Sequence, residues 1–177
     1  DAELAAAIRE QIGDAVPEEG GIPLRVPTVA ENGGQVPVSV LVESPQTEAS
    51  HVTAIHLFTP RNPTAGVASF RLTPLLARAE VQTRIRLAEE QSASLATPRI
   101  RAPRSARPGE AVEIRTLIEH PMETGLRHQG ARPVPRDMLN RLTVRVNGAL
   151  ALQAELRNGT AANPYHVFFL RLERTSE

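Results

Sequence analysis

Four segments of this sequence place apolar residues at every second position. They lie at residues 36–42, 81–87, 112–118 and 142–146, and Val, Ile and Leu fill most of those positions. A strand with this alternation buries one face and leaves the other in water, as strands of antiparallel sheets do. Turn signals separate the segments, and Asn147-Gly148 is typical of a two-residue hairpin. Many short strands at this spacing predict β-sandwiches.

The start of the chain has a different period. Leu4, Ile8 and Ile12 recur every four residues, Asp1 can cap the segment, and Gly13 can end it. This pattern predicts a short amphipathic helix from residue 1 to about residue 15. We expect it to pack on a neighbouring surface, and the alternative is an anchor for a partner or a membrane.

Composition excludes several classes of function. The 177 residues carry 20 basic residues, all arginine, and 20 acidic ones, so the formal net charge is zero. This balance argues against non-specific binding to nucleic acid. The absence of cysteine excludes disulfides, thiolate metal sites and cysteine nucleophiles. There is no apolar run of about 18 residues to span a membrane, and we expect no signal peptide at the start.

The sequence matches itself at an offset of 76 positions. Pro27 falls on Pro103, Gly33 on Gly109, and the start of the segment at 36–42 on that at 112–118. The alternative is a chance match between generic sandwich patterns. The repeat predicts that "ASLATPRIRAP" (93–103) is a boundary. The fold class is then all-β, with two tandem immunoglobulin-like β-sandwiches at 20–97 and 98–177 after an N-terminal helix at 1–19.

Long stretches of both halves resemble a known pair of proteins. In the first half these are "VPTVAENGGQVPVSVLVESP", "AIHLFTPRNPTAGVASFRLTP" and "AEVQTRIRLAEEQ". In the second they are "PRIRAPRSARPGEAVEIRTLIEHPMETGLR" and "NPYHVFFLRLERTSE". The first half resembles SoxY and the second resembles SoxZ, so the chain is similar to a fused SoxYZ protein.

The resemblance implies a function. SoxYZ is a non-catalytic periplasmic carrier that holds sulfur intermediates covalently while other enzymes of thiosulfate oxidation act on them. It implies no catalytic residue, cofactor or metal. The implied partners are periplasmic cytochrome and hydrolase components, together with SoxY–SoxZ pairing within the chain. The alternative is a SoxYZ-like adaptor of a periplasmic quinoprotein dehydrogenase, without covalent carriage.

Two departures from the family bear on that function. In SoxY a hairpin precedes a Gly-rich tail whose cysteine bears the sulfur, but here SoxZ-like sequence follows at about Thr97 with no such arm. The SoxZ-like half also stops at Glu177, before a last acidic strand expected from the family. Carriage needs a thiolate on a mobile tether, and no residue in the sequence substitutes for it.

The most polar loop is "HPMETGLRHQG". His120, Met122, Glu123, Thr124 and Gly125 are candidates for a docking surface for partner enzymes, and a plain structural turn is the favoured alternative. A metal site is disfavoured because the spacing of the histidines and the glutamate matches no common ligand pattern.

The other candidate residues have ordinary structural explanations. His51, His56 and His166 are predicted to be satisfied structural histidines rather than ligands or bases. Asn158-Gly159-Thr160 matches a glycosylation sequon, but a turn is favoured. Arg84 and Arg86 are expected on a solvated sheet face, with a shallow anion-docking surface as the alternative. No G-x-S-x-G elbow is present to support a hydrolase.

Overall fold

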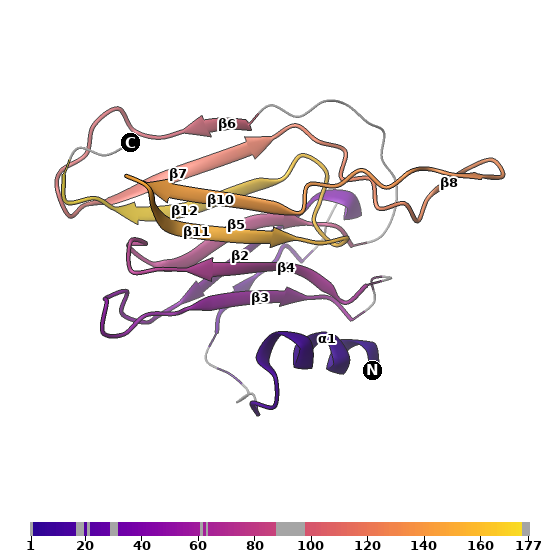
Figure 1. Ribbon diagram of the computed structural model, residues 1–177, viewed down its shortest axis with the longest axis horizontal. Coiled ribbons are helices and arrows are strands. Elements are labelled where there is room, and N and C mark those ends of the chain that lie inside the picture. The colour runs from indigo at the N-terminus through magenta and orange to yellow at the C-terminus, as the bar shows by residue number, and fades with distance from the viewer. Residues whose placement is uncertain are drawn as a thin grey trace.

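The protein is mostly β-structure. The computed structural model describes residues 2–16, 20, 22–28, 32–60, 62, 64–87 and 98–174. Across those residues one helix and a short 3-10 turn accompany twelve strands (Figure 1). The elements are α1 (Ala2–Ile12), β1 (Leu24–Arg25), η1 (Gly33–Gln35), β2 (Val36–Val42), β3 (Ala54–Phe58), β4 (Gly66–Leu72), β5 (Ala79–Ile85), β6 (Pro98–Arg101), β7 (Ala111–Ile118), β8 (His128–Gln129), β9 (Arg132–Pro133), β10 (Arg141–Val146), β11 (Ala149–Leu156) and β12 (Tyr165–Arg171).

Two antiparallel sheets face each other. The larger has six strands in the order β1-β2-β5-β12-β7-β6, and the smaller has four in the order β10-β11-β4-β3. A separate two-stranded ribbon joins β8 to β9. The predicted all-β class with a short N-terminal helix is confirmed, and the sheets are consistent with two immunoglobulin-like sandwiches. Residues 20–97 and 98–177 each contribute three strands to the larger sheet and two to the smaller.

The repeat at 76 positions is present in the strand pairing. Leu24 lies opposite Val40 between β1 and β2. Seventy-six positions later, Ile100 lies opposite Thr116 between β6 and β7. The adjacent pair repeats in the same register. The repeated sequence therefore encodes the same strand pair twice, once at each end of the larger sheet.

The two halves of the chain are joined edge to edge within both sheets. In the larger sheet His166 of β12 lies opposite Thr83 of β5. In the smaller sheet β11 pairs with β4 from Leu152↔Leu72 to Leu156↔Ala68. Hydrogen-bonded ladders therefore cross between the halves in both layers. The predicted junction at 93–97 lies outside the described residues.

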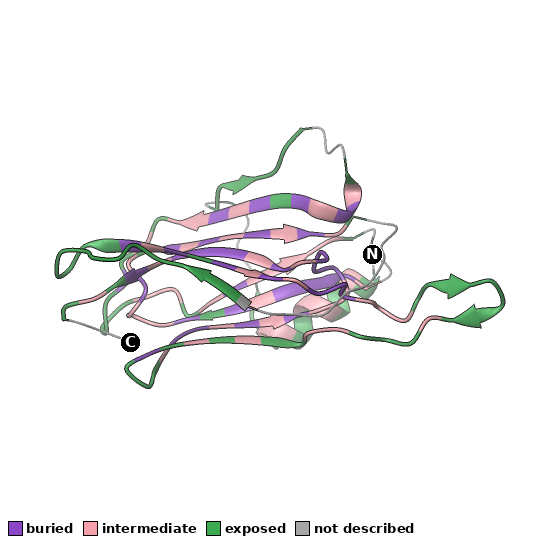
Figure 2. Ribbon diagram, turned by 90° about the horizontal axis from the view of Figure 1, so that it is seen from above, coloured by how far each residue is buried: buried purple, intermediate pink, exposed green. Residues whose placement is uncertain are grey.

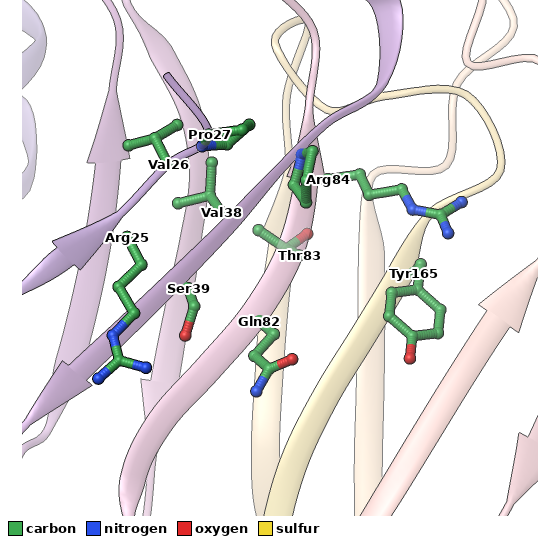
Figure 3. A pocket seen from close by; sticks show the side chains of 10 residues that line it. Arg25, Val26, Pro27, Val38, Ser39, Gln82, Thr83, Arg84 and Tyr165 are labelled. Carbon is green, nitrogen blue, oxygen red and sulfur yellow. The ribbon is translucent and has the colours of Figure 1, made fainter. Parts of the chain in front are cut away.

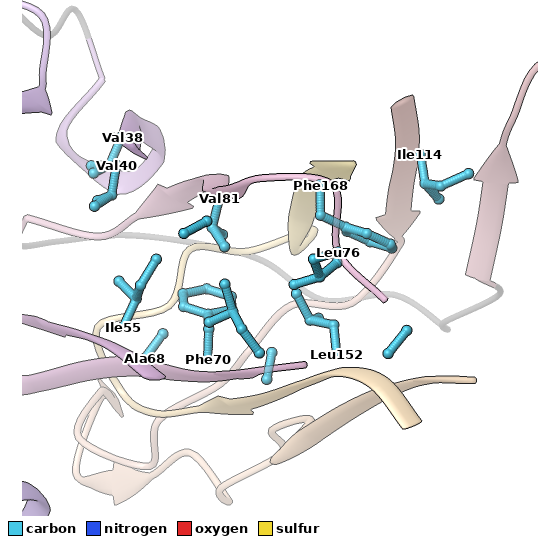
Figure 4. Packing of buried hydrophobic residues seen from close by; sticks show 14 of the residues in the cluster. Val38, Val40, Ile55, Ala68, Phe70, Leu76, Val81, Ile114, Leu152 and Phe168 are labelled. Carbon is cyan, nitrogen blue, oxygen red and sulfur yellow. The ribbon is translucent and has the colours of Figure 1, made fainter. Parts of the chain in front are cut away.

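One apolar core fills the space between the sheets. Phe70 of β4 and Phe168 of β12 both point into this space, which Leu76 and Leu152 also fill (Figure 4). All four side chains are fully buried. Burying a side chain of this size stabilises the fold by about 1.5–3 kcal/mol. Because these side chains come from both halves, each half covers the apolar face of the other.

Helix α1 packs on strands β3 and β4 of the smaller sheet. The hydroxyl of Ser69 donates to Oε1 of Gln11 at 3.3 Å, and Nδ1 of His56 lies 2.9 Å from the same hydroxyl. The prediction that the helix packs on a neighbouring surface is confirmed, whereas Asp1 lies outside the described residues. Among the described residues, no helix is long and apolar enough to cross a membrane.

The sequon Asn158-Gly159-Thr160 forms a turn between β11 and β12, as predicted. Thr160 is only 1% exposed, and its hydroxyl donates to the carbonyl of Val67 at 3.0 Å. The carbonyl of Gly159 accepts from the backbone N–H of Arg86 at 2.7 Å. This turn of the second half is therefore inserted against the first half.

Gly159 is expected to tolerate no larger residue. A Cβ at this position would lie 2.7 Å from Cγ2 and 3.1 Å from Cα of Val67. We expect Gly159→Ala to lower the free energy of unfolding by about 1–3 kcal/mol, because the crowded site must shift. Denaturant unfolding measures the loss. In the double variant with Val67→Ala the cost should be smaller than the two single costs added, and full additivity would contradict this origin.

Candidate docking site

The predicted docking loop begins where β7 ends. The backbone N–H of His120 donates to Oδ1 of Asn163 at 3.0 Å, and the N–H of Asn163 donates to the carbonyl of His120 at 2.8 Å. Asn163 has a φ of 53°, a conformation that asparagine tolerates better than most residues. The loop is thus attached to the connection that leads into β12.

Two of the five predicted docking residues point inward. Met122 is 0% exposed and belongs to the main core, and His120 is 8% exposed. The N–H of Met122 donates to Nδ1 of His120 at 3.0 Å, which closes a tight turn at a φ of 53°. These two side chains anchor the loop, so they do not face a docking partner. The docking role of the loop as a whole stays a prediction.

Arg86 of the first half donates a hydrogen bond to this loop. Nη2 of Arg86 donates to the carbonyl of Met122 at 3.3 Å, and Nδ2 of Asn62 donates to the carbonyl of Arg86 at 2.7 Å. Burial lowers the pKa of Arg86, and the carboxylate of Glu123 acts in the opposite direction. Arg86 is half-buried and so does not lie on a solvated sheet face, contrary to one of the two expectations for it.

The remaining three predicted residues shape the outer part of the loop. Oε2 of Glu123 accepts from Nε of Arg127 at 3.0 Å and from Nη2 at 2.8 Å. Gly125 has a φ of 78°, and a Cβ there would lie 3.1 Å from Cβ of Arg136. The turn therefore requires glycine, and the charge of Glu123 is already balanced within the loop. Thr124 is half-exposed and accepts from the N–H of Leu126 at 3.3 Å.

The loop is closed on its far side by Asp137. Oδ1 of Asp137 lies 3.4 Å from Nε2 of His120, and its N–H donates to the carbonyl of Glu123 at 2.9 Å. Within the described ranges, no three His, Cys, Asp or Glu side chains are placed to hold a metal ion. His128, the third residue of the disfavoured metal pattern, lies out on the β8–β9 ribbon.

Sequence reasoning missed the ribbon that grows from this loop. Strands β8 and β9 form a hairpin that projects from the body of the molecule (Figure 1), and both strands are exposed along their whole length (Figure 2). The signal was available in residues 126–136, which contain three arginines, two prolines and a glycine but no acidic residue.

A second candidate surface lies on the outer face of the larger sheet. A groove of 420 Å³ runs across β1, β2, β5 and β12. The guanidinium of Arg84 lies 4.9 Å from the ring centre of Tyr165, and Arg25 stands on the opposite side of the groove (Figure 3). Because the two cations stand apart, they do not converge on one small anion. Arg84 is thus a groove residue at the junction of the halves.

The remaining histidines differ in their surroundings. His56 is satisfied by Ser69, as predicted, and burial is the main cause that lowers its pKa. Because the Ser69 hydroxyl also donates to Gln11, the pair links helix α1 to the smaller sheet. His166 is fully buried with no hydrogen-bond partner at either ring nitrogen, so it is structural but not satisfied. His51 is half-exposed beside β3.

Comparisons with known proteins identify both halves. The family model described as sulfur oxidation protein SoxY matches residues 8–98. The model described as sulphur oxidation protein SoxZ matches residues 100–177. No curated protein matches the chain. The two matches follow one another in tandem, and the half that each covers supplies five of the strands in the two sheets.

Proposed function

The chain belongs to the SoxY family, continued in tandem by a SoxZ match, and on this basis we propose that it is a carrier protein of periplasmic sulfur oxidation. In this proposal sulfur intermediates of thiosulfate oxidation are held covalently on a cysteine arm of the SoxY part. Residues 1–177 contain no cysteine, so the proposal assigns the thiol to a segment outside them. Catalysis resides in the partner enzymes.

The tandem family match carries the proposal, and the shared sheets support it. A carrier must hold one cargo while several enzymes act in turn, so its body has to present a constant surface. Ladders between β5 and β12 and between β4 and β11 join the two halves into such a body. We propose that this junction is the SoxY–SoxZ pairing surface. Fusion keeps each half at a high effective concentration for the other.

The docking role remains part of this proposal. The loop of His120, Met122, Glu123, Thr124 and Gly125 lies where Arg86 of the SoxY part meets the SoxZ part. A surface at that place would form only when both parts are correctly assembled, so a partner that binds it would recognise the assembled protein. We propose that its outward atoms belong to the face that cytochrome and hydrolase components of the pathway recognise.

A second function is favoured by a separate observation. The SoxY match ends at residue 98 and the SoxZ match starts at 100, so no cysteine arm separates them. A chain of this kind without a thiol would act as an adaptor, for example on a periplasmic quinoprotein dehydrogenase. It would dock through the same face but hold no sulfur.

Intact-protein mass distinguishes the two functions. The native protein is purified from its source and incubated with thiosulfate and the purified sulfur-oxidation enzymes of the same organism. A carrier gains mass on a cysteine peptide and loses it after reduction with a thiol. A protein that binds these enzymes or the dehydrogenase without gaining mass is an adaptor. A protein that binds none of them and gains no mass contradicts both functions.

A further inference from the structure

The β8–β9 hairpin contributes little to the packing of the fold. Its two strands, His128–Gln129 and Arg132–Pro133, pair through two residues each, and the described body does not bury them. Both strands project beyond the two sheets (Figures 1 and 2). A two-stranded hairpin on its own is marginally stable in water. The hairpin therefore adds little to stability, and its surface is free to meet another molecule.

The charge of this hairpin has one sign. From Leu126 to Arg136 the sequence holds three arginines and no acidic residue. The guanidinium of Arg127 pairs with Glu123 at 2.8 Å. Across the part of the chain that the structure describes, no carboxylate pairs with Arg132 or Arg136. Two cations of the hairpin are thus available to a partner.

The hairpin belongs to the basic half of the chain. Residues 98–177 contain thirteen arginines and eight acidic residues, whereas residues 1–97 contain seven arginines and twelve acidic residues. The formal charge of the whole chain is zero, so a uniform electrostatic field does not explain partner choice. A local cluster of unpaired cations still attracts an acidic surface and orients it on approach.

The base of the hairpin is held firmly. Glu123 and Asp137 form a β-bridge below it, and the N–H of Val134 donates to the carbonyl of Arg127 at 2.9 Å. Leu126 stands at this base with 55% of its surface exposed. A hairpin whose base is already ordered loses less conformational entropy on binding than a flexible segment does. An exposed leucine at the base of a hairpin that carries two unpaired arginines offers an apolar contact with a cationic rim.

We propose that the hairpin Leu126–Arg136 docks on an acidic surface of a partner protein, with Arg132 and Arg136 as the cationic contacts and Leu126 as the apolar one. The identity of that partner as a sulfur-oxidation enzyme rests on the proposed function. Nucleic acid is disfavoured as the occupant, because two unpaired cations on a chain of zero net charge release few counterions.

The test compares two charge reversals of equal size in the full chain. Arg132→Glu with Arg136→Glu changes the hairpin, and Arg141→Glu with Arg145→Glu changes exposed residues of β10 in the same half. The first probe is a ten-residue polyglutamate peptide, followed by NMR shifts of the isotope-labelled chain. The second is the set of purified sulfur-oxidation enzymes, followed by calorimetry at two salt concentrations. Thermal unfolding checks that both variants fold.

We expect a specific set of amide signals to shift and a specific loss of affinity. The peptide should shift the amides of Leu126–Arg136, and the hairpin reversal should weaken binding of both probes by about tenfold or more. The β10 reversal should leave affinity within about twofold, and added salt should weaken binding to the wild type. Shifts centred on the groove of Arg25 and Arg84 would overturn the assignment, as would equal affinity of the two variants.

Failure of the hairpin and failure of the proposed function give different results. An enzyme that binds the wild type and the hairpin reversal equally well removes the hairpin from docking but leaves the carrier function standing. If no enzyme binds the wild type, the carrier function is contradicted, and the peptide still decides the hairpin. Self-association of the chain that only the hairpin reversal abolishes would make a second copy the occupant and overturn the assigned partner.

Discussion

Replacing Phe168 with alanine is expected to lower the free energy of unfolding of the entire chain by about 3–5 kcal/mol, in a single transition. Phe168 is 0% exposed and lies in the same core as Phe70, which comes from the other half of the chain. Its strand β12 pairs with β5 on one side and β7 on the other. Removing the ring leaves a cavity that both halves line, so neither half can keep its stability.

The adjacent residue is the matched control. Phe169 lies on the outer face of the same strand, half-buried beneath the guanidinium of Arg78 at 4.8 Å. Phe169→Ala should cost about 1 kcal/mol, since the lost contacts are a cation–π pair and a partly wet ring. Equilibrium unfolding in urea, followed by circular dichroism and by calorimetry, measures both. Two separate transitions, of which Phe168→Ala moves only one, would contradict a shared core.

Acid is expected to destabilise this protein through His166. Its ring packs edge-on against Phe70 with centroids 5.7 Å apart, and neither ring nitrogen has a hydrogen-bond partner. Burial lowers the pKa of His166 to about 4, from 6.5. Thr83 and Thr116 lie opposite it on the two neighbouring strands, and both are buried.

The sign of the effect follows from where the proton binds. Above pH 6.5 the imidazole is neutral in both states and contributes no pH dependence. Between pH 6.5 and about 4 the unfolded chain takes up a proton that the folded chain excludes, so stability falls as the pH falls. The loss from this one group amounts to about 3 kcal/mol at the lower end of the window.

The variant His166→Leu isolates this contribution. Leucine has a similar volume and no polar atom, so the variant should be at least as stable as the wild type at pH 7. The difference between the two proteins should then grow by about 3 kcal/mol as the pH is lowered to 4. The half-exposed His51, changed to glutamine, is the control and should leave the profile unchanged. A parallel pH profile for His166→Leu and the wild type would show that the imidazole is hydrated or charged in the folded state.

The local structure of this protein was largely readable from its sequence. The alternation at 36–42 and at 112–118 predicted β2 and β7 to within a residue. Asn147 and Gly148 have φ values of 48° and 82°, as the predicted two-residue hairpin requires. Such features depend on neighbours one to four positions away, so a single stretch of sequence contains them entirely.

Which side chains of the candidate docking loop are buried could not be predicted from the sequence. The loop follows β7, and Met122 and His120 anchor it because their side chains are buried and Met122 has a positive φ. The same polar residues occur in exposed turns and in buried turns, and only tertiary packing distinguishes the two kinds of turn. The projecting hairpin was missed because its strands are two residues long, too short for any period to show.

The order of strands in the sheets was decided by tertiary structure alone. Alternation of apolar and polar residues indicates each strand, and the offset of 76 positions predicted that one pattern of strands occurs twice. Nothing in that alternation says that β5 meets β12 or that β4 meets β11. Edges of strands carry the same backbone donors and acceptors whatever their sequence, so the choice between them is made by the shape of the core that Phe70 and Phe168 fill together. The sequence thus determined two similar halves, and their shared apolar interior made them one body.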